Sequence, residues 1–443
     1  MGGYREQGRS SFALKSGNKY YLFDAGVKKV YSEGRYGEPP YLELLNTSKI
    51  EAVFISHLHE DHMAMAPWLF RNGYNGPLYM SKPTADLGIA QWYKWAELFE
   101  KQGTIYYTSE DCDEARNHIK IVSDREKINI DELEVLFYQS GHAIGSMSLD
   151  ITTDKFSIFY AADINIGSSV LEDPELPNKT WDVMIVNSSY GDQIINQQFY
   201  DKMIEEVILH TLKENGKVLI PVTAIGRGQE MVAFLLKHKE IIENASNIFV
   251  EKSIMEGFEK ISSYESFLKR EFKEILKHKP YLKPPFTQFV KEEALDITTH
   301  ERSIILATDL MLMGTSQQIF MKIKSHQNSA VILTGYQAPG TFGRHLLEFK
   351  DAGAFVFDNS VVDFSCRVYD IPVKMHFDAQ ENLELVQRSL AKNGIVILHH
   401  GEEPKSLELH CFLSKYIKPE QIYVPLIPSS FFWVSRNERG LEA

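Results

Sequence analysis

The chain has 443 residues, of which 44% are hydrophobic and 12% aromatic, so it is long enough to form two or three domains with separate cores. Its formal net charge of -13 argues against a protein that coats nucleic acid non-specifically, because phosphate contacts need clustered Lys and Arg. No apolar run approaches the roughly 20 residues of a membrane helix, and the first residues lack the plan of a signal peptide. We therefore expect a cytoplasmic protein that has no membrane partner.

The three cysteines, Cys112, Cys366 and Cys411, are far apart in the sequence and form no Cys-x-x-Cys pair. This spacing indicates neither a disulfide framework nor a cysteine zinc site. We expect buried free thiols.

Short strands separated by polar turns are predicted over the first 190 residues. Apolar or alternating runs place strands at 20–24, 52–56, 133–138 and 156–160. Several of these strands are followed by a polar residue that could take part in chemistry.

The strongest signal follows the strand at 52–56, where residues 56–62 read SHLHEDH. In an extended loop, residues two apart project the same way, so His57 and His59 can share one ion while Asp61 and His62 turn toward another. Imidazole and carboxylate ligands without a thiolate suit a hydrolytic Zn²⁺ or Mn²⁺ site that keeps an open position for water.

Two metal ions need more ligands than one loop supplies, and other strand ends offer them. His142 lies in the turn SGHAIG, Asp163 ends the strand at 159–163, and His400 follows the apolar run that begins at residue 394. An aspartate at a strand end is well placed to bridge two cations. The adjacent His399 is the alternative to His400, and we favour His400.

The pattern changes from about Gln198 to alternating helices and strands. Buried-strand runs at 217–221, 303–307 and 330–334 are typical of a parallel α/β unit. The strand that ends in histidine returns in the last part of the chain. We therefore expect a first domain over residues 1–195, an inserted domain over 196–364, and the remainder of the first domain over 365–443.

These motifs resemble the metallo-β-lactamase superfamily, and the later segments resemble its β-CASP branch of nucleases, which includes ribonuclease J and the pre-mRNA cleavage endonuclease. The resemblance covers almost the whole chain. It rests on the opening glycines, on DAG at 24–26, and on the segments IPVTAIGRGQE at 220–230, ATDLM at 307–311 and GYQAPGTFGR at 335–344. It implies an α/β fold, an αββα metallo-β-lactamase sandwich with an inserted α/β β-CASP domain, and an active site in the cleft between them.

The resemblance also implies two zinc ions per chain, with Mn²⁺ as the alternative metal. One ion would have three histidine ligands, the other a mixed set, and one aspartate would bridge them: His57, His59 and His142 for the first, Asp61, His62 and His400 for the second, and Asp163 as the bridge. Asp24 would support the site without binding metal, and Asp61 would also be catalytic. Two adjacent metal ions of this kind activate a bridging water for in-line attack on a phosphate.

The leaving oxygen needs a proton, and the resemblance assigns that role to His376 in the segment KMHFD. The alternative is a core histidine. The family usually orients this imidazole with an acidic residue, but the corresponding segment here reads VNSSYG, with Asn187 in that position. Asn187 can accept a hydrogen bond from the imidazole, yet its neutral amide cannot stabilise an imidazolium as a carboxylate would. Slower turnover, a smaller substrate or a different proton donor could follow.

The favoured function is that of a zinc-dependent ribonuclease acting on single-stranded RNA. His400 favours RNA over DNA, because the DNA-repair branch of the family usually has an aliphatic residue in this motif. We expect Thr308, Thr341 and Arg344 to bind substrate, with simple turn chemistry as the alternative for the segment around Thr341. Asp309 adds negative charge where the family often has a small residue.

Two other functions stay open. One is a DNA nuclease or a phosphodiesterase with a small substrate, and the other is a weakly active scaffold subunit of a nucleic-acid-processing complex. A homodimer is expected from the resemblance alone.

Overall fold

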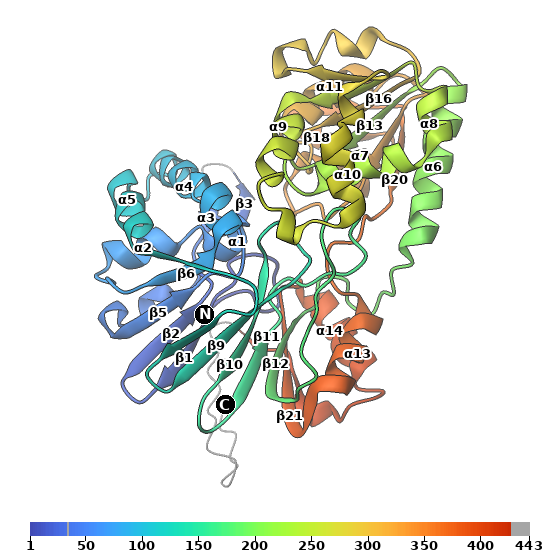
Figure 1. The fold of residues 1–443 in the computed structure, drawn as a ribbon. Helices are drawn as coiled ribbons and strands as arrows, with labels where there is room; N and C mark the ends of the chain where they lie inside the picture. Colours follow the sequence, from blue (N-terminus) through green and yellow to red (C-terminus); the bar gives the residue numbers. More distant parts are fainter. Residues whose placement is uncertain (33–34, 427–443) are drawn as a thin grey trace. The chain divides into compact units, whose positions relative to one another are not determined.

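The computed structural model describes residues 1–32 and 35–426, which form two compact units (Figure 1). Unit 1 contains Met1–Gly167, Leu171–Ile195 and the chain from Met375 onward. Unit 2 contains Asn196–Lys374 and the short segment Ser168–Val170. Unit 1 is therefore built from both ends of the chain, and unit 2 is inserted into it.

Two β-sheets form the centre of unit 1. The 5-stranded sheet has the order β1 (Phe12–Ser16), β2 (Lys19–Phe23), β5 (Ile50–Phe54), β6 (Leu78–Ser81) and β7 (Ile119–Val122). The 7-stranded sheet has the order β22 (Ile422–Tyr423), β21 (Leu390–His399), β12 (Trp181–Asn187), β11 (Ser157–Tyr160), β10 (Met147–Thr152), β9 (Leu133–Gln139) and β8 (Lys127–Ile130). A separate hairpin consists of β3 (Lys28–Ser32) and β4 (Arg35–Glu38).

The two sheets of unit 1 pack face to face, and helices cover their outer faces. Phe54 of β5 meets Phe137 of β9 with ring centroids 6.2 Å apart, and Phe12 of β1 meets Tyr160 of β11 at 4.9 Å. The helices α13 (Ala379–Ser389) and α14 (Glu403–Leu413) pack on β21 and share a buried cluster with it. The helix α3 (Lys82–Gly88) packs on β6 and β7 of the other sheet. This is an αββα sandwich, as predicted.

The remaining helices of unit 1 are short or lie beyond the 5-stranded sheet. They are α1 (Glu60–Met63), α2 (Ala66–Arg71), α4 (Ala90–Lys101) and α5 (Ser109–Asn117). In α4, Trp92, Trp95 and Phe99 are buried at helical spacing, so that one face of the helix packs into the protein.

Unit 2 is built on a 6-stranded parallel sheet. Its order is β15 (Phe286–Phe289), β14 (Asn247–Glu251), β16 (Ser303–Ala307), β13 (Lys217–Pro221), β17 (Ala330–Leu333) and β20 (Arg367–Asp370). Every residue of β13, β16 and β17 is buried, which is why these strands are almost continuously apolar.

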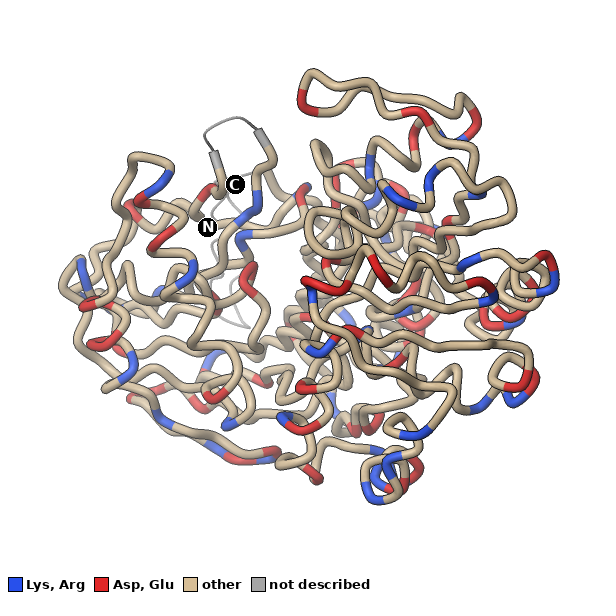
Figure 2. The backbone as a smooth tube through the Cα atoms, turned by 90° about the horizontal axis from the view of Figure 1, so that it is seen from above, with Lys and Arg blue, Asp and Glu red and all other residues tan. Residues whose placement is uncertain are grey.

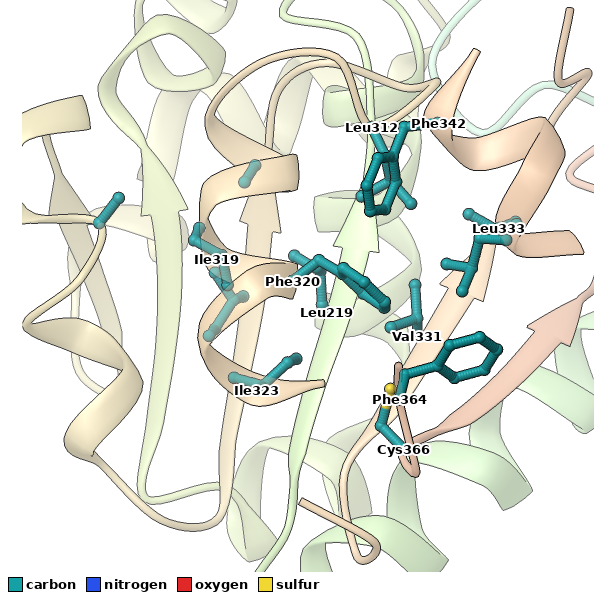
Figure 3. Packing of buried hydrophobic residues seen from close by; sticks show 14 of the residues in the cluster. Leu219, Leu312, Ile319, Phe320, Ile323, Val331, Leu333, Phe342, Phe364 and Cys366 are labelled. Carbon is teal, nitrogen blue, oxygen red and sulfur yellow. The ribbon is translucent and has the colours of Figure 1, made fainter. Parts of the chain in front are cut away.

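Helices pack against this sheet and complete its core. They are α6 (Gln197–Lys213), α7 (Arg227–Lys237), α8 (Lys239–Asn244), α9 (Lys252–Ile261), α10 (Arg270–His278), α11 (Thr315–Ile323) and α12 (Phe342–Glu348). Figure 3 shows Phe320 of α11 and Phe342 of α12 among the buried side chains of this core, together with Leu219 of β13 and Val331 of β17. A hairpin of β18 (Ala354–Phe357) and β19 (Ser360–Asp363) follows α12.

The inserted unit continues further along the chain than the expected range 196–364. β20 pairs in parallel with β17, with Ala330 opposite Arg367, so residues 365–374 belong to unit 2. The segment Ser168–Val170 also groups with unit 2, because the carboxylate of Glu230 accepts hydrogen bonds from Ser168 and Ser169. Of the range 365–443, residues 427–443 lie outside the described residues.

Charged residues of both signs are interspersed along the backbone of each unit (Figure 2). Mixed charge of this kind is typical of solvated surfaces. None of the helices in the described part of the chain has both the length and the apolar character that crossing a membrane requires.

Candidate metal centre

The loop after β5 begins the candidate metal centre of unit 1. His57 and His62 are buried, and His59 stands directly before α1 as its N-cap residue. Two backbone hydrogen bonds of 2.8 Å hold the loop in place. Ser10 N–H donates to the Asp61 carbonyl, and Ala25 N–H donates to the His62 carbonyl. The segments around the opening glycines and the DAG motif therefore fix the course of this loop.

Gly26 shows why the DAG motif needs a glycine. A Cβ atom at this position would lie 1.7 Å from the carbonyl oxygen of Asp61. The backbone of the loop could not approach the DAG segment so closely beside any larger residue.

Three histidines and one aspartate form a first group of possible ligands. His59 Nδ1 lies 3.1 Å from both His57 Nε2 and His142 Nε2. Asp163 Oδ2 lies 3.7 Å from His57 Nε2 and 3.5 Å from His142 Nε2. One ligand atom from each of these residues lies within 4.8 Å of all the others.

Asp61, His62 and His400 form a second group, and a third group of Asp163, His376 and His400 connects it with the first. Asp61 Oδ2 lies 2.9 Å from His400 Nε2 and 3.8 Å from His62 Nε2. Asp163 lies beside this group too, with Oδ2 3.5 Å from His62 Nε2 and Oδ1 3.3 Å from His400 Nδ1. Asp163 therefore stands between two adjacent sets of ligand atoms.

His399 is not part of these groups among the described residues, although it is adjacent to His400. Its Nδ1 atom is buried and has no hydrogen-bond partner, and its ring meets the ring of Tyr4 edge to face at 5.3 Å. His399 ends β21 and His400 follows it, and of these two histidines His400 lies beside the other candidate ligands.

The ring nitrogens of the first group converge on one point, and the hydrogen bonds around them fix which nitrogen of His142 is free. His142 Nδ1 lies 2.7 Å from the carbonyl oxygen of Met375, which accepts its proton and leaves Nε2 unprotonated in the neutral ring. Burial lowers the pKa of both His57 and His142 well below the usual value for histidine, which favours neutral rings. A single proton on His59 Nδ1 could serve only one of its two neighbours at 3.1 Å, so the converging neutral nitrogens, together with the Asp163 carboxylate, fit a divalent metal ion.

Asp163 supports the same conclusion. Its Oδ1 atom is buried and accepts no hydrogen bond from the residues that the structure describes, although His400 Nδ1 lies 3.3 Å away. A buried carboxylate oxygen without a hydrogen bond costs free energy unless it binds something else. A metal ion in each of the two groups would satisfy both oxygens of Asp163.

Asp24 contacts the side chain of His62, one of the candidate ligands. Its Oδ2 atom accepts hydrogen bonds from Tyr160 Oη at 2.6 Å and Ser56 Oγ at 2.8 Å, and it lies 2.8 Å from His62 Nδ1. A carboxylate on one ring nitrogen orients the imidazole and leaves the other nitrogen for a metal. Asp24 thus has the supporting position that the family resemblance implies.

His376 lies beside both groups. Its Nε2 atom is 3.3 Å from Asp163 Oδ2, and its ring stacks on that of His142 with centroids 4.7 Å apart. The backbone on either side is fixed, because Phe377 N–H donates to the Ile164 carbonyl at 2.7 Å and the Asp378 side chain caps α13. The side chain remains 12% exposed, so this imidazole can reach solvent or a substrate.

Asn187 does not contact His376 as the sequence suggests. It ends β12 opposite His399 of β21, is fully buried, and neither polar atom of its side chain has a hydrogen-bond partner among the described residues. The expected hydrogen bond from the imidazole to Asn187 is therefore absent. The side chain lies instead in the protein interior at the end of β12.

Tyr190 is a residue near His376 that sequence reasoning missed. Met375 N–H donates a hydrogen bond to Tyr190 Oη at 3.0 Å, and the tyrosine ring lies 6.0 Å from the ring of His376 in an edge arrangement. The only available signal was its place in the VNSSYG segment that the resemblance had already singled out.

The three residues expected to bind substrate lie in unit 2, each at the end of a strand or the start of a helix. Thr308 donates its backbone N–H and its hydroxyl to Glu251 Oε2, at 2.7 and 2.9 Å. Thr341 caps α12 by accepting from Arg344 N–H at 3.2 Å. The Arg344 side chain is 37% exposed and donates to Glu348 at 2.6 Å. Both threonine side chains thus have structural partners, and substrate binding by these residues stays a prediction.

The cysteines lie apart from this centre. Cys112 and Cys366 are buried, and burial raises the pKa of each thiol to about 12, so both stay protonated. Cys411 is exposed, and the prediction that all three thiols are buried is wrong for this residue. The metal centre contains only nitrogen and oxygen ligand atoms.

Comparisons with known proteins agree with the fold and the ligand set. The family model of the metallo-beta-lactamase superfamily matches residues 4–156, and the model of the Beta-Casp domain matches residues 207–346. The chain belongs to the β-CASP family of the metallo-β-lactamase superfamily. Members of this family are metal-dependent hydrolases, so this β-CASP chain is an enzyme of that kind.

Several curated β-CASP relatives match over most of this chain. An RNase J-like protein of Methanocaldococcus jannaschii is 28% identical, with 94% of this chain and 95% of the relative covered. Transcription termination factor FttA of the same organism is 27% identical, covering 96% of this chain and 70% of the relative. Endoribonuclease YSH1 of Eremothecium gossypii is 27% identical, and this chain spans 54% of its length.

A solved structure shares the fold. It is the crystal structure of a protein of unknown function from Enterococcus faecalis V583, with a TM-score of 0.51 and 14% identity over 91% of this chain and 93% of that one. At this identity the likeness concerns the fold alone.

Proposed function

We propose that this β-CASP chain is a zinc-dependent nuclease that hydrolyses phosphodiester bonds in single-stranded RNA. The observation that carries the proposal is the set of adjacent groups of possible ligand atoms around Asp163, which is 3.3 to 3.7 Å from ring nitrogens of both His57, His142 and His62, His400. Two adjacent cations are the arrangement that phosphodiester hydrolysis uses to hold both the attacking and the leaving oxygen.

Each ligand group would hold one zinc ion. The proposed ligands are His57, His59 and His142 for the first ion, Asp61, His62 and His400 for the second, and Asp163 for both. Bound zinc would lower the pKa of a shared water toward neutrality and offset the charge of the phosphate. Imidazole and carboxylate ligands also bind Mn²⁺, which is the alternative metal.

The residues of this chain would then orient the reaction and supply a proton. Asp61 would both hold the second zinc ion and take part in catalysis, because its Oδ2 atom lies 2.9 Å from His400 Nε2 while its side chain is 24% exposed. His376 would give a proton to the leaving oxygen from its partly exposed imidazole. Asn187 has no contact that assigns it a part in this step.

The preference for RNA rests on two observations. Two of the relatives carry names that refer to ribonuclease activity, the RNase J-like protein and endoribonuclease YSH1. His400 would provide the last metal ligand by an imidazole, and by the family resemblance a histidine in this motif is typical of RNA-cleaving members. Arg344, Thr341 and Thr308 are proposed phosphate contacts in unit 2. A cytoplasmic location and a homodimer stay predictions from the sequence.

Two residues that depart from the usual family sequence are the reason for considering other functions. Asn187 replaces a carboxylate, and Asp309 places a negative charge in the ATDLM segment of a chain with a net charge of -13. Both changes would weaken turnover on a long anionic substrate. A small-substrate phosphodiesterase, a DNA nuclease and a weakly active scaffold subunit are the resulting alternatives.

A substrate panel separates these functions. The purified, zinc-loaded protein would be incubated with labelled single-stranded RNA, single-stranded DNA of the same sequence and a cyclic dinucleotide. Cleavage of RNA at least ten times faster than the other two supports the proposal, and faster cleavage of DNA or of the cyclic dinucleotide overturns it. The exposed His278→Ala variant is a control that should match wild type.

A further inference from the structure

We propose that Tyr190 is a positioning residue for His376, which it holds in place through the backbone of Met375. This inference rests on the proposed function, because it concerns the histidine that would protonate the leaving oxygen. Asn187, in the position that usually orients this histidine, has no hydrogen bond from its side chain among the described residues, so another residue must orient His376.

The peptide groups of Met375 are held from two directions. Its N–H donates to Tyr190 Oη at 3.0 Å, and its carbonyl oxygen accepts from His142 Nδ1 at 2.7 Å. Met375 directly precedes His376, so fixing both of its polar backbone atoms fixes the point from which the imidazole projects. This pair of hydrogen bonds also links His376 to His142, a proposed zinc ligand.

The rings of the same two residues contact the imidazole itself. His376 stacks on His142 with centroids 4.7 Å apart and 29° between planes, and it meets Tyr190 at 6.0 Å and 68°. Offset-stacked and edge arrangements of this kind are the favourable geometries for aromatic pairs. Tyr190 and His142 therefore limit both the backbone and the side chain of His376.

No regular strand or helix provides this constraint. His376 lies between β20, which ends at Asp370, and α13, which begins at Ala379. In such a segment the position of a side chain depends on individual hydrogen bonds, and a displacement of about 1 Å in a reacting group can lower a rate about 100-fold. Removing the acceptor on Met375 N–H should therefore affect turnover more than substrate binding.

The test is a double-mutant cycle of Tyr190→Phe and His376→Ala, measured on single-stranded RNA with the full zinc-loaded chain. Tyr190→Phe keeps the ring and removes only Oη. We expect kcat to fall about tenfold, KM to stay within twofold and zinc content to match wild type. In the His376→Ala background the same change should have no further effect on kcat, because a positioning residue acts through the residue that it positions.

Controls separate this role from a general loss of structure. Tyr93 of α4 donates an exposed hydrogen bond from its hydroxyl to Asp113 of α5. Tyr93→Phe removes this hydroxyl and should leave kcat unchanged. A tenfold loss that is the same in both backgrounds, or a loss of zinc in Tyr190→Phe, would overturn the inference.

Crystal structures of the zinc-loaded wild type and Tyr190→Phe decide the inference independently of turnover. A displaced His376 imidazole in the variant supports it, and an unmoved imidazole contradicts it. If the wild type cleaves no RNA, the proposed function fails while this comparison still decides the role of Tyr190.

Discussion

Asp24 Oδ2 lies 2.8 Å from His62 Nδ1, and neither residue is exposed to solvent. The same carboxylate accepts hydrogen bonds from Tyr160 and Ser56, so its position is fixed from several sides. His62 is held so that Nε2 faces Asp61 and Asp163. Asp24 thus affects the proposed second zinc ion indirectly, by orienting His62, which is one of the proposed ligands of that ion.

Asp24→Asn should weaken this second zinc site. The amide cannot accept all of these hydrogen bonds, and loss of such an outer partner typically lowers metal affinity about 10- to 100-fold. We expect the variant to bind one zinc ion as tightly as wild type and the other about 10- to 100-fold more weakly, measured by competition with a chelator. Asp131→Asn is the control, because Asp131 also accepts from a tyrosine and pairs with Lys19 but is partly exposed. Equal zinc affinity in Asp24→Asn and wild type would contradict the role of Asp24.

Asn187→Leu should leave both stability and activity close to wild type. The side chain is fully buried and its amide has no hydrogen-bond partner, so its desolvation already costs free energy that an apolar residue of similar size would not. We expect an unchanged or higher free energy of unfolding in urea and an unchanged kcat on RNA. A large fall in kcat with normal folding would restore the hypothesis that Asn187 orients His376.

Much of the candidate metal centre could be predicted from the sequence because its candidate ligands stand shortly after strands. The predicted strand at 52–56 corresponds to β5, and the period of two in the following loop correctly indicated that His57 and His59 face the same place. The predicted runs at 217–221 and 303–307 coincide with β13 and β16, since buried parallel strands are apolar throughout. These predictions needed only the pattern of apolar and polar residues within short stretches of the sequence.

Contacts between distant residues could not be predicted in the same way. The hydrogen bond from Met375 to Tyr190 joins residues separated by 185 positions, and nothing near either residue indicates it. The burial of the Asn187 side chain depends on packing around the end of β12, which a single sequence does not specify. β20 was not anticipated because Arg367–Asp370 is short and half polar, and its place in unit 2 follows from pairing with β17.

Glu230 should make the stability of the protein depend on pH. Burial raises the pKa of this carboxyl group, while Ser168 and Ser169 donate hydrogen bonds to it and partly oppose the shift. A raised pKa in the folded state means that the contribution to stability is present below the usual pKa and is lost as pH rises through the folded value. Each unit of upward shift corresponds to about 1.4 kcal/mol.

Glu230→Gln removes this titration while keeping an oxygen that can accept from Ser169. We expect the free energy of unfolding of the variant, relative to wild type, to increase as pH rises above the usual carboxyl pKa of 4.5, measured by circular dichroism during urea unfolding. The exposed Glu256→Gln variant should show no such trend. A difference between Glu230→Gln and wild type that stays constant with pH would contradict the assigned burial effect.

The most direct test of the proposed two-zinc nuclease combines zinc content with cleavage of labelled single-stranded RNA for wild type, His59→Ala and His376→Ala. The proposal predicts two zinc ions per wild-type chain, loss of zinc and cleavage in His59→Ala, and normal zinc with at least a 100-fold lower kcat in His376→Ala, a loss on the order of what general acid catalysis contributes. Cleavage by wild type without bound metal, or full activity in His376→Ala, would contradict it.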